Sequence, residues 1–158
     1  MGIKEKIRRS PFLLAIGWLI LPILFLVLTT IINLAIKLPI WTSPLLIVLG
    51  LLLIVLGLVC RYSTFKRLVP LNKSIKSDYV PEQFTTDGIF KSSRNPAYVG
   101  IMLMFIGSFL LAINLLMIIV VIIIFVWLNN QINNEEKVLT QKFGKPYIEY
   151  KNKTPRWI

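Results

Sequence analysis

The chain has 158 residues, of which 56% are hydrophobic, and its mean hydropathy is +0.73. This composition excludes an ordinary soluble domain, and the length leaves room for only one membrane domain, which we expect to cover residues 1–158. The formal net charge is +11, histidine is absent and Cys60 is the single cysteine, so the sequence excludes an intrachain disulfide, a zinc cluster and imidazole chemistry, and we expect no metal site.

Three uncharged runs predict an all-α integral membrane protein with four transmembrane helices. The runs comprise 26 residues at 11–36, 23 residues at 38–60 and 40 residues at 95–134. The first is longer than the core of a signal peptide and no small-x-small cleavage site stands out, so we expect it to be retained. The predicted spans cover about residues 11–36, 42–61, 96–113 and 115–132.

The forty-residue run is the most informative of the three. As one helix it would be about 60 Å long, roughly twice the hydrocarbon thickness of a bilayer. We therefore predict a hairpin that turns near Ile113-Asn114. The hairpin would bring Arg94, just before it, next to Glu135 and Glu136, just after it, at one membrane face.

The basic residues predict which face this is. Seventeen of the eighteen Lys and Arg residues lie in the first ten residues, in residues 61–94 or from residue 137 onward, which leaves only Lys37 for the outer turns. Because Lys and Arg collect in cytoplasmic segments, we expect both termini, the loop 62–95 and a helix and tail at 133–158 to be cytosolic. The positive charge then reflects topology and attraction to anionic lipid, and we expect no nucleic-acid partner.

Local signals refine these elements. Pro44 is expected to open the second helix, and Asn95-Pro96 to start the third, with Asn95 as the N-cap and Pro96 at the first helical position. Gly50 and Gly57 share their spacing with Gly100 and Gly107, which predicts close packing of the second helix on the third. For Gly100, helix contact and close approach of a cofactor are both open.

The last helix should continue beyond the membrane and stop at Gly144, which is followed by Pro146. We expect Tyr147, Tyr150 and Trp157 in the tail to lie at the headgroup level. Neither Glu135 nor Glu136 has a basic residue three or four positions away, so the pair indicates a recognition site for a cation or hydroxyl group. The alternative is an ordinary solvated helix face.

Two motifs resemble a known family. The segment Arg94-Asn95-Pro96-Ala97-Tyr98-Val99-Gly100 resembles the Arg-His-Pro-x-Tyr-x-Gly signature of the isoprenylcysteine carboxyl methyltransferase and phospholipid methyltransferase group of integral membrane enzymes. The downstream residues Glu135-Glu136, Leu139, Phe143-Gly144, Tyr147, Tyr150 and Pro155-Arg156-Trp157 are similar to the C-terminal pattern of this group. The resemblance covers about residues 85–158, and Asn95 stands where better-known members have histidine.

This resemblance implies an S-adenosylmethionine-dependent methyltransferase that acts at the cytosolic interface on a lipophilic acceptor, either a carboxylate or an amine, with the lipid bilayer as its surroundings. It implies that Glu136 takes part in catalysis and that Lys142 orients the substrate. The cofactor-binding residues that it implies are Arg94, Asn95, Pro96, Tyr98, Val99, Gly100, Glu135 and Leu139.

Two other functions remain open at this point. One is a membrane reductase, because sterol reductases are similar in fold and in their C-terminal half, although a nicotinamide cofactor would call for more phosphate-binding basic residues than Arg94 and Lys91. The other is a four-helix membrane module without catalytic activity. The sequence indicates neither the acceptor nor the oligomeric state.

Overall fold

The computed structural model describes residues 16–71 and 83–158. Residues 11–15 of the first predicted span and residues 72–82 of the predicted loop lie outside the described residues. Within the described ranges all regular elements are helical: α3 (Ile20–Ala35), α4 (Pro44–Leu71), the 3-10 helix η1 (Gly88–Lys91), α5 (Pro96–Leu111), α6 (Leu115–Phe143) and α7 (Lys145–Lys153).

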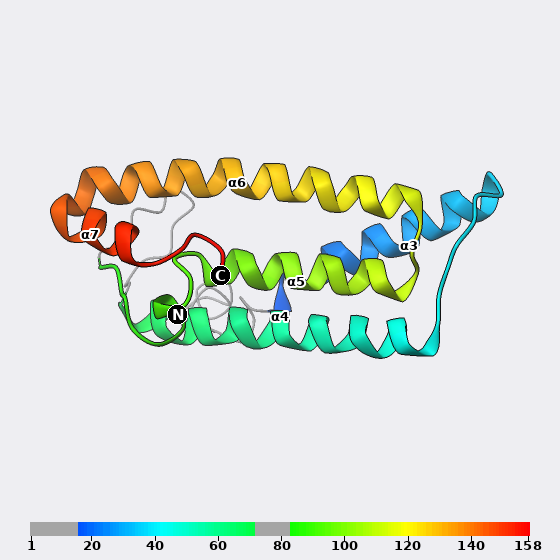
Figure 1. Cartoon of the computed structure of the whole chain (residues 1–158), viewed down its shortest axis with the longest axis horizontal. Helices are drawn as coiled ribbons and strands as arrows, with labels where there is room; N and C mark the ends of the chain where they lie inside the picture. Colours follow the sequence, from blue (N-terminus) through cyan, green and yellow to red (C-terminus); the bar gives the residue numbers. More distant parts are fainter. Residues whose placement is uncertain (1–15, 72–82) are drawn as a thin grey trace, which may run out of the picture.

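The helices α4, α5 and α6 lie roughly side by side, with α5 between the other two (Figure 1). The helix α3 crosses obliquely, and α4 and α6 extend past the start of α5 to the end of the molecule where α7 lies (Figure 1). Among the described helices, α4 and α6 are long and apolar enough to cross a membrane, and α3 and α5 are shorter apolar helices.

The outward surfaces of α3, α4 and α6 are apolar. Large aliphatic side chains such as Ile31, Leu52 and Ile123 are more than half exposed, whereas Ile101, Met104, Phe105, Met117 and Leu128 form the buried core. An exposed apolar surface of this extent would be unfavourable in water and is typical of a protein surrounded by lipid. The described helices are therefore those of a membrane protein.

The predicted close packing of the second helix on the third is confirmed. A Cβ atom added to Gly57 would lie 2.5 Å from the carbonyl oxygen of Gly100, and one added to Gly50 would lie 2.6 Å from that of Gly107. No side chain fits at these distances. Helix contact thus accounts for all four glycines, Gly100 included.

Replacing Gly57 with alanine is expected to lower the free energy of unfolding by about 1 to 3 kcal/mol, because α4 must move away from α5. The control is Leu52→Ala on the same helix, where the side chain is 54% exposed and a change within about 0.5 kcal/mol is expected. Thermal unfolding in detergent measures both. Equal melting temperatures of the two variants would contradict the packing.

The predicted hairpin turn is also confirmed. The helix α5 ends at Leu111, α6 begins at Leu115, and the side chain of Asn114 caps α6 by accepting a 2.8 Å hydrogen bond from the backbone N–H of Met117. The turn pairs with the α3–α4 connection through an isolated antiparallel bridge, in which Trp41 and Ile113 exchange backbone hydrogen bonds of 3.0 and 2.9 Å. Pro44 opens α4, as predicted.

The polar end differs from the predictions in three ways. The helix α4 continues past residue 61, the predicted end of the second span, to Leu71, because the buried Arg61 and Thr64 extend its packed face. Gly144, with a φ of 61°, stops α6 as predicted, but the chain then enters a new helix, α7, with Pro146 in its first turn. Tyr147 and Tyr150 on α7 are only 3% and 8% exposed, so they pack inside the protein and do not lie among headgroups.

Candidate functional site

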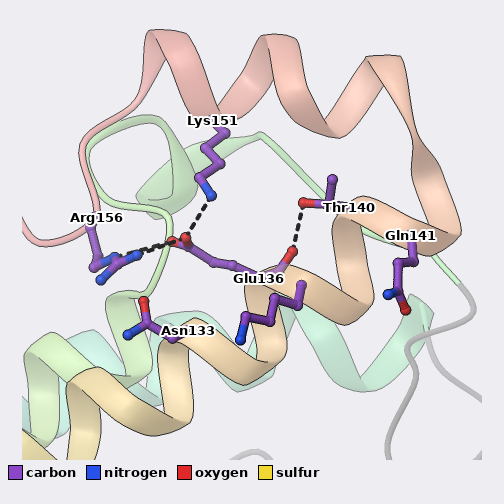
Figure 2. A pocket seen from close by; sticks show the side chains of 7 residues that line it. Asn133, Glu136, Thr140, Gln141, Lys151 and Arg156 are labelled. Carbon is purple, nitrogen blue, oxygen red and sulfur yellow. Dashed lines mark hydrogen bonds and ion pairs between the residues drawn. The ribbon is translucent and has the colours of Figure 1, made fainter.

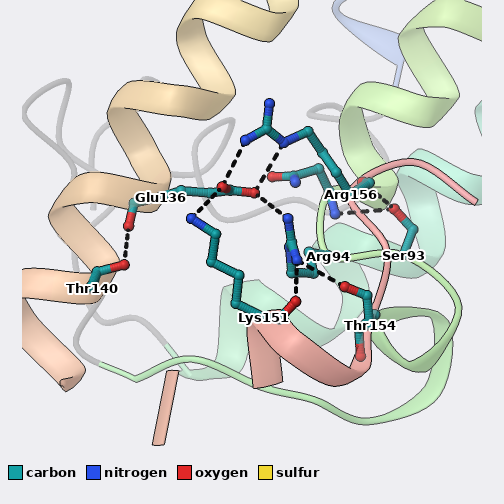
Figure 3. A network of polar contacts seen from close by, with 8 residues as sticks. Ser93, Arg94, Glu136, Thr140, Lys151, Thr154 and Arg156 are labelled. Atoms are coloured by element: carbon teal, nitrogen blue, oxygen red, sulfur yellow. Dashed lines mark hydrogen bonds and ion pairs between the residues drawn. The ribbon is translucent and has the colours of Figure 1, made fainter. Parts of the chain in front are cut away.

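The two ends of the hairpin meet in an ion pair, as the charge pattern predicted. The Arg94 guanidinium, just before α5, lies 3.0 Å from Oε1 of Glu136 on α6. Glu136 is 2% exposed, and its Oε2 also accepts from Arg156 at 2.9 Å and from Lys151 at 3.1 Å (Figure 3). The buried carboxylate of Glu136 thus forms ion pairs with one cation just before α5 and two cations in the C-terminal part of the chain.

The same arginine fastens the C-terminal tail to the start of α5. Arg94 Nη1 donates to the carbonyl oxygens of Lys151 and Thr154, and its backbone N–H donates to the carbonyl of Pro155 at 2.9 Å. The neighbouring Ser93 donates from its hydroxyl to the carbonyl of Arg156 at 2.9 Å. We refer to Arg94, Glu136, Lys151 and Arg156 with these bonds as the latch (Figure 3).

The latch determines the charge state of Glu136. Burial alone would favour the neutral acid, but the hydrogen bonds from Arg156 and Lys151 and the positive charges of Arg94 and Arg156 outweigh it and lower the pKa of Glu136 below 4.5. Glu136 is therefore an ionised structural anchor at neutral pH. Its lone pairs are engaged by protein cations, which leaves it poorly placed to accept a proton from a substrate.

Glu135, the adjacent residue, has different surroundings. Its carboxylate accepts a hydrogen bond from the phenol of Tyr98 on α5. Burial raises the pKa of Glu135 above 4.5, and the bond from Tyr98 offsets only part of this effect. Together with Leu68 on α4, Glu135 lines two adjoining cavities.

The first cavity, which we call the aromatic cavity, has a volume of about 110 Å³. Its wall combines aromatic rings with polar side chains: Leu68, Gln83, Phe84, Thr85, Phe90, Arg94, Asn95, Glu135, Leu139, Tyr147 and Tyr150. Among the described residues, Arg94 Nε and Asn95 Nδ2 are buried donors without a hydrogen-bond acceptor. Buried donors are costly unless a partner binds them, so these two indicate a ligand with acceptor atoms.

The aromatic rings come from two segments that are far apart in the sequence, residues 84–90 and residues 143–150. Phe84 packs against Phe143, Tyr147 and Tyr150 with ring centroids 4.8 to 6.2 Å apart, and the hydroxyl of Tyr150 donates to the carbonyl of Phe90 at 2.7 Å. Burial raises the pKa of Tyr147 to about 12 and raises that of Tyr150 further, so both remain neutral phenols. Phe84 and Phe90 were not predicted as site residues, because neither belongs to a motif in the sequence.

The second cavity, which we call the apolar cavity, has a volume of about 280 Å³. It is lined by Trp18, Arg61, Phe65, Leu68, Ala97, Tyr98, Ile101 and Glu135. Arg61 is 2% exposed, donates to the carbonyl of Ala97 at 3.3 Å and lies 5.2 Å from the ring centroid of Phe65. The wall thus combines apolar side chains with a cation, Arg61, a carboxylate, Glu135, and a phenol, Tyr98, which suits an amphipathic ligand.

The structure distributes the remaining predicted site residues differently. Leu139 lines the aromatic cavity, whereas Pro96, Val99 and Gly100 are buried without lining either cavity. Lys142 is exposed, lines neither cavity, and places its ammonium 5.6 Å from the ring centroid of Phe143. Asn95 is the N-cap residue of α5, with Pro96 in the first turn, as predicted, but its side chain makes no capping hydrogen bond, and Asn95 also lines the aromatic cavity.

Comparisons with known proteins identify the family. A family model described as phospholipid methyltransferase matches residues 45–146. A protein of Saccharomyces cerevisiae (strain ATCC 204508 / S288c) named protein-S-isoprenylcysteine O-methyltransferase is 35% identical over 114 residues, which cover 67% of this chain and 46% of the yeast protein. The chain thus spans about half the length of that relative.

Proposed function

Because the chain belongs to the phospholipid methyltransferase family, we propose that it is an S-adenosylmethionine-dependent methyltransferase that acts on a lipophilic acceptor at the cytosolic membrane interface. In this proposal the cofactor binds in the aromatic cavity and reaches toward Glu135, and the acceptor occupies the apolar cavity. Glu135 and Leu68, which the two cavities share, mark where donor and acceptor would meet.

The chain's own residues fit this cofactor. The observation that carries the proposal is the pair of buried, unpartnered donors, Arg94 Nε and Asn95 Nδ2, in one cavity with an acidic side chain and several aromatic rings. The donors suit the carboxylate, ribose or adenine acceptors of the cofactor, and Glu135 suits its ammonium or ribose hydroxyls. The aromatic faces suit an adenine ring or a sulfonium cation.

When bound, the cofactor supplies an activated methyl group on a sulfonium, which an in-line displacement transfers without a metal. The protein's contribution is alignment in a site that excludes water. The latch fixes the start of α5, and thereby Asn95 and Tyr98, relative to Glu135 on α6. The aromatic cavity is smaller than most ligand sites, so we propose that the two adjoining cavities form one binding site.

The charges of the apolar cavity favour one class of acceptor. If Glu135 binds the cofactor, Arg61 is the remaining charged group of that cavity, and it would attract a carboxylate and repel a protonated amine. We therefore propose a lipophilic carboxylic acid as the acceptor. A lipophilic amine is the alternative, for which Glu135 or Tyr98 would have to accept the proton.

Methyl transfer itself can be tested with the purified chain, a native lipid extract and methyl-labelled S-adenosylmethionine. The proposal predicts a labelled lipophilic product that mass spectrometry identifies as a methyl ester. A labelled amine would replace the proposed acceptor class and retain the enzyme. If the product forms at the same rate with Glu135→Gln, the assigned site is wrong.

We also propose four membrane crossings with both termini in the cytosol. The latch and the Trp41–Ile113 bridge lie at opposite ends of the helix bundle, and Lys37 is the basic residue near the bridge end. In a Cys60→Ala background, the Lys37→Cys variant is expected to react with a membrane-impermeant maleimide from outside intact cells. The Lys153→Cys variant is expected to react only after the membrane is opened. The reverse pattern would contradict the orientation.

A pH titration should separate cofactor binding from folding. Glu135 has a raised pKa, so its ionised form, and with it cofactor affinity, is expected to be lost as the pH falls through a value above 4.5. Glu136 has a lowered pKa, so its contribution to stability is complete above the unfolded-state value near 4.5 and is lost only at lower pH. Calorimetry and thermal unfolding from pH 7 to pH 4 measure the two effects. Simultaneous loss of both would contradict this assignment.

A further inference from the structure

A third hollow lies on the side of the latch that faces away from the two cavities. It is an open groove of about 490 Å³, lined by Asn133, Glu136, Lys137, Thr140, Gln141, Lys151 and Arg156 (Figure 2). It shares no lining residue with the aromatic or the apolar cavity. The groove is therefore a separate feature, which the proposed methyl transfer does not use.

The groove carries an excess of positive charge. Three cations, Lys137, Lys151 and Arg156, face one carboxylate, Glu136, which also pairs with Arg94 from behind. The other lining side chains are the amides of Asn133 and Gln141 and the hydroxyl of Thr140, which donates to the carbonyl of Glu136 at 2.6 Å. Cations with neutral donors beside them are suited to bind a phosphate group.

The position of the groove along α6 points to the source of that phosphate. Asn133 is six residues beyond Trp127, the last of the large exposed apolar residues on this helix, which corresponds to about 9 Å along the axis. In a bilayer this is the level just outside the hydrocarbon core. Trp157 stacks on Phe125 at 5.5 Å, which adds an aromatic pair at the same boundary.

The face of α6 below the groove is apolar and exposed. Residues that precede Asn133 at intervals of three or four positions lie on the same face of α6 and form one stripe along the helix. The apolar residues of this stripe are 46% to 59% exposed and comprise Ile119, Ile122, Ile123 and Val126. The cationic groove suits the phosphate headgroup of a phospholipid, and the adjoining apolar face of α6 suits its acyl chains.

We propose that the groove binds the phosphate of an anionic membrane phospholipid, whose acyl chains lie along this exposed face of α6. Because Glu136 and its pair with Arg94 separate the groove from the aromatic cavity, the bound lipid is not the methyl acceptor. The lipid phosphate instead stabilises the latch by binding the side chains of Lys151 and Arg156. Lys151 and Arg156 contribute both to the groove and to the latch, so occupancy should stabilise the fold.

Native mass spectrometry of the full chain in detergent tests this proposal with phosphatidylglycerol, phosphatidylcholine and inorganic phosphate as separate probes. Wild-type protein is expected to retain phosphatidylglycerol in preference to phosphatidylcholine. Lys137→Gln is expected to weaken this binding about fivefold, because it removes one cation near the headgroup. Lys137 is exposed and is not part of the latch, so the variant should fold.

The matched control is Lys145→Gln, which removes an exposed lysine from the start of α7 and should leave lipid binding unchanged. Equal affinity of wild type and Lys137→Gln, or equal weakening by both variants, would overturn the proposal. Equal retention of the two lipids would also overturn it. If inorganic phosphate binds as tightly as phosphatidylglycerol, the groove is a site for free phosphate and the lipid assignment is wrong. No cofactor is added, so the outcome is independent of the methyltransferase proposal.

Discussion

Replacing Glu136 with glutamine is expected to lower the free energy of unfolding by about 3 to 5 kcal/mol, because it leaves the cations of the latch without their buried counter-charge. Arg94 and Arg156 would then repel each other around a neutral amide. The tail should separate from the start of α5. Binding of S-adenosylmethionine is expected to disappear as a consequence of this loss of structure.

Thermal unfolding in detergent measures this effect, with Glu149→Gln as the control. Glu149 is an exposed carboxylate on α7, so its replacement should change the free energy of unfolding by no more than about 0.5 kcal/mol. A melting temperature of Glu136→Gln equal to that of the control would show that the latch does not stabilise the protein.

The substitution Glu135→Gln, at the adjacent position, is expected to lower cofactor affinity and to leave the stability of the fold unchanged. It should weaken cofactor binding by about 1.5 to 3 kcal/mol, roughly tenfold to a hundredfold, because a charge-assisted contact becomes a neutral one. The melting temperature should change little, since Glu135 is exposed and a glutamine at this position can still accept from Tyr98 through its amide oxygen. Calorimetry with S-adenosylmethionine measures the affinity, and unchanged affinity in a folded variant would assign Glu135 to structure alone.

These two neighbours could not be distinguished from the sequence. The absence of basic residues at helical spacing identified the pair as unusual, but the partners of Glu136 lie 15, 20 and 42 positions away. Such contacts depend on the path of the tail, which turns at Gly144 and returns as α7. Arg94 both forms hydrogen bonds in the latch and lines the aromatic cavity. Arg94→Ala should therefore lower the stability of the fold as well as the cofactor affinity.

The hairpin and the glycine contacts were predictable because each follows from a local pattern with a single geometric solution. A long uncharged run must turn back, and matching glycine spacings on two helices allow their backbones to approach. The tail was not predictable in this way. Tyr147 and Tyr150 among lysines are suited to a membrane surface, and only the presence of Phe84 and Phe90 opposite them gives these rings a buried alternative.

The most direct test of the central claim is calorimetric titration of the purified chain in detergent with the demethylated product of S-adenosylmethionine. We expect saturable binding to the wild-type protein and binding weakened about tenfold to a hundredfold in Glu135→Gln, with both proteins folded. No binding to a folded wild-type protein at millimolar ligand would contradict it.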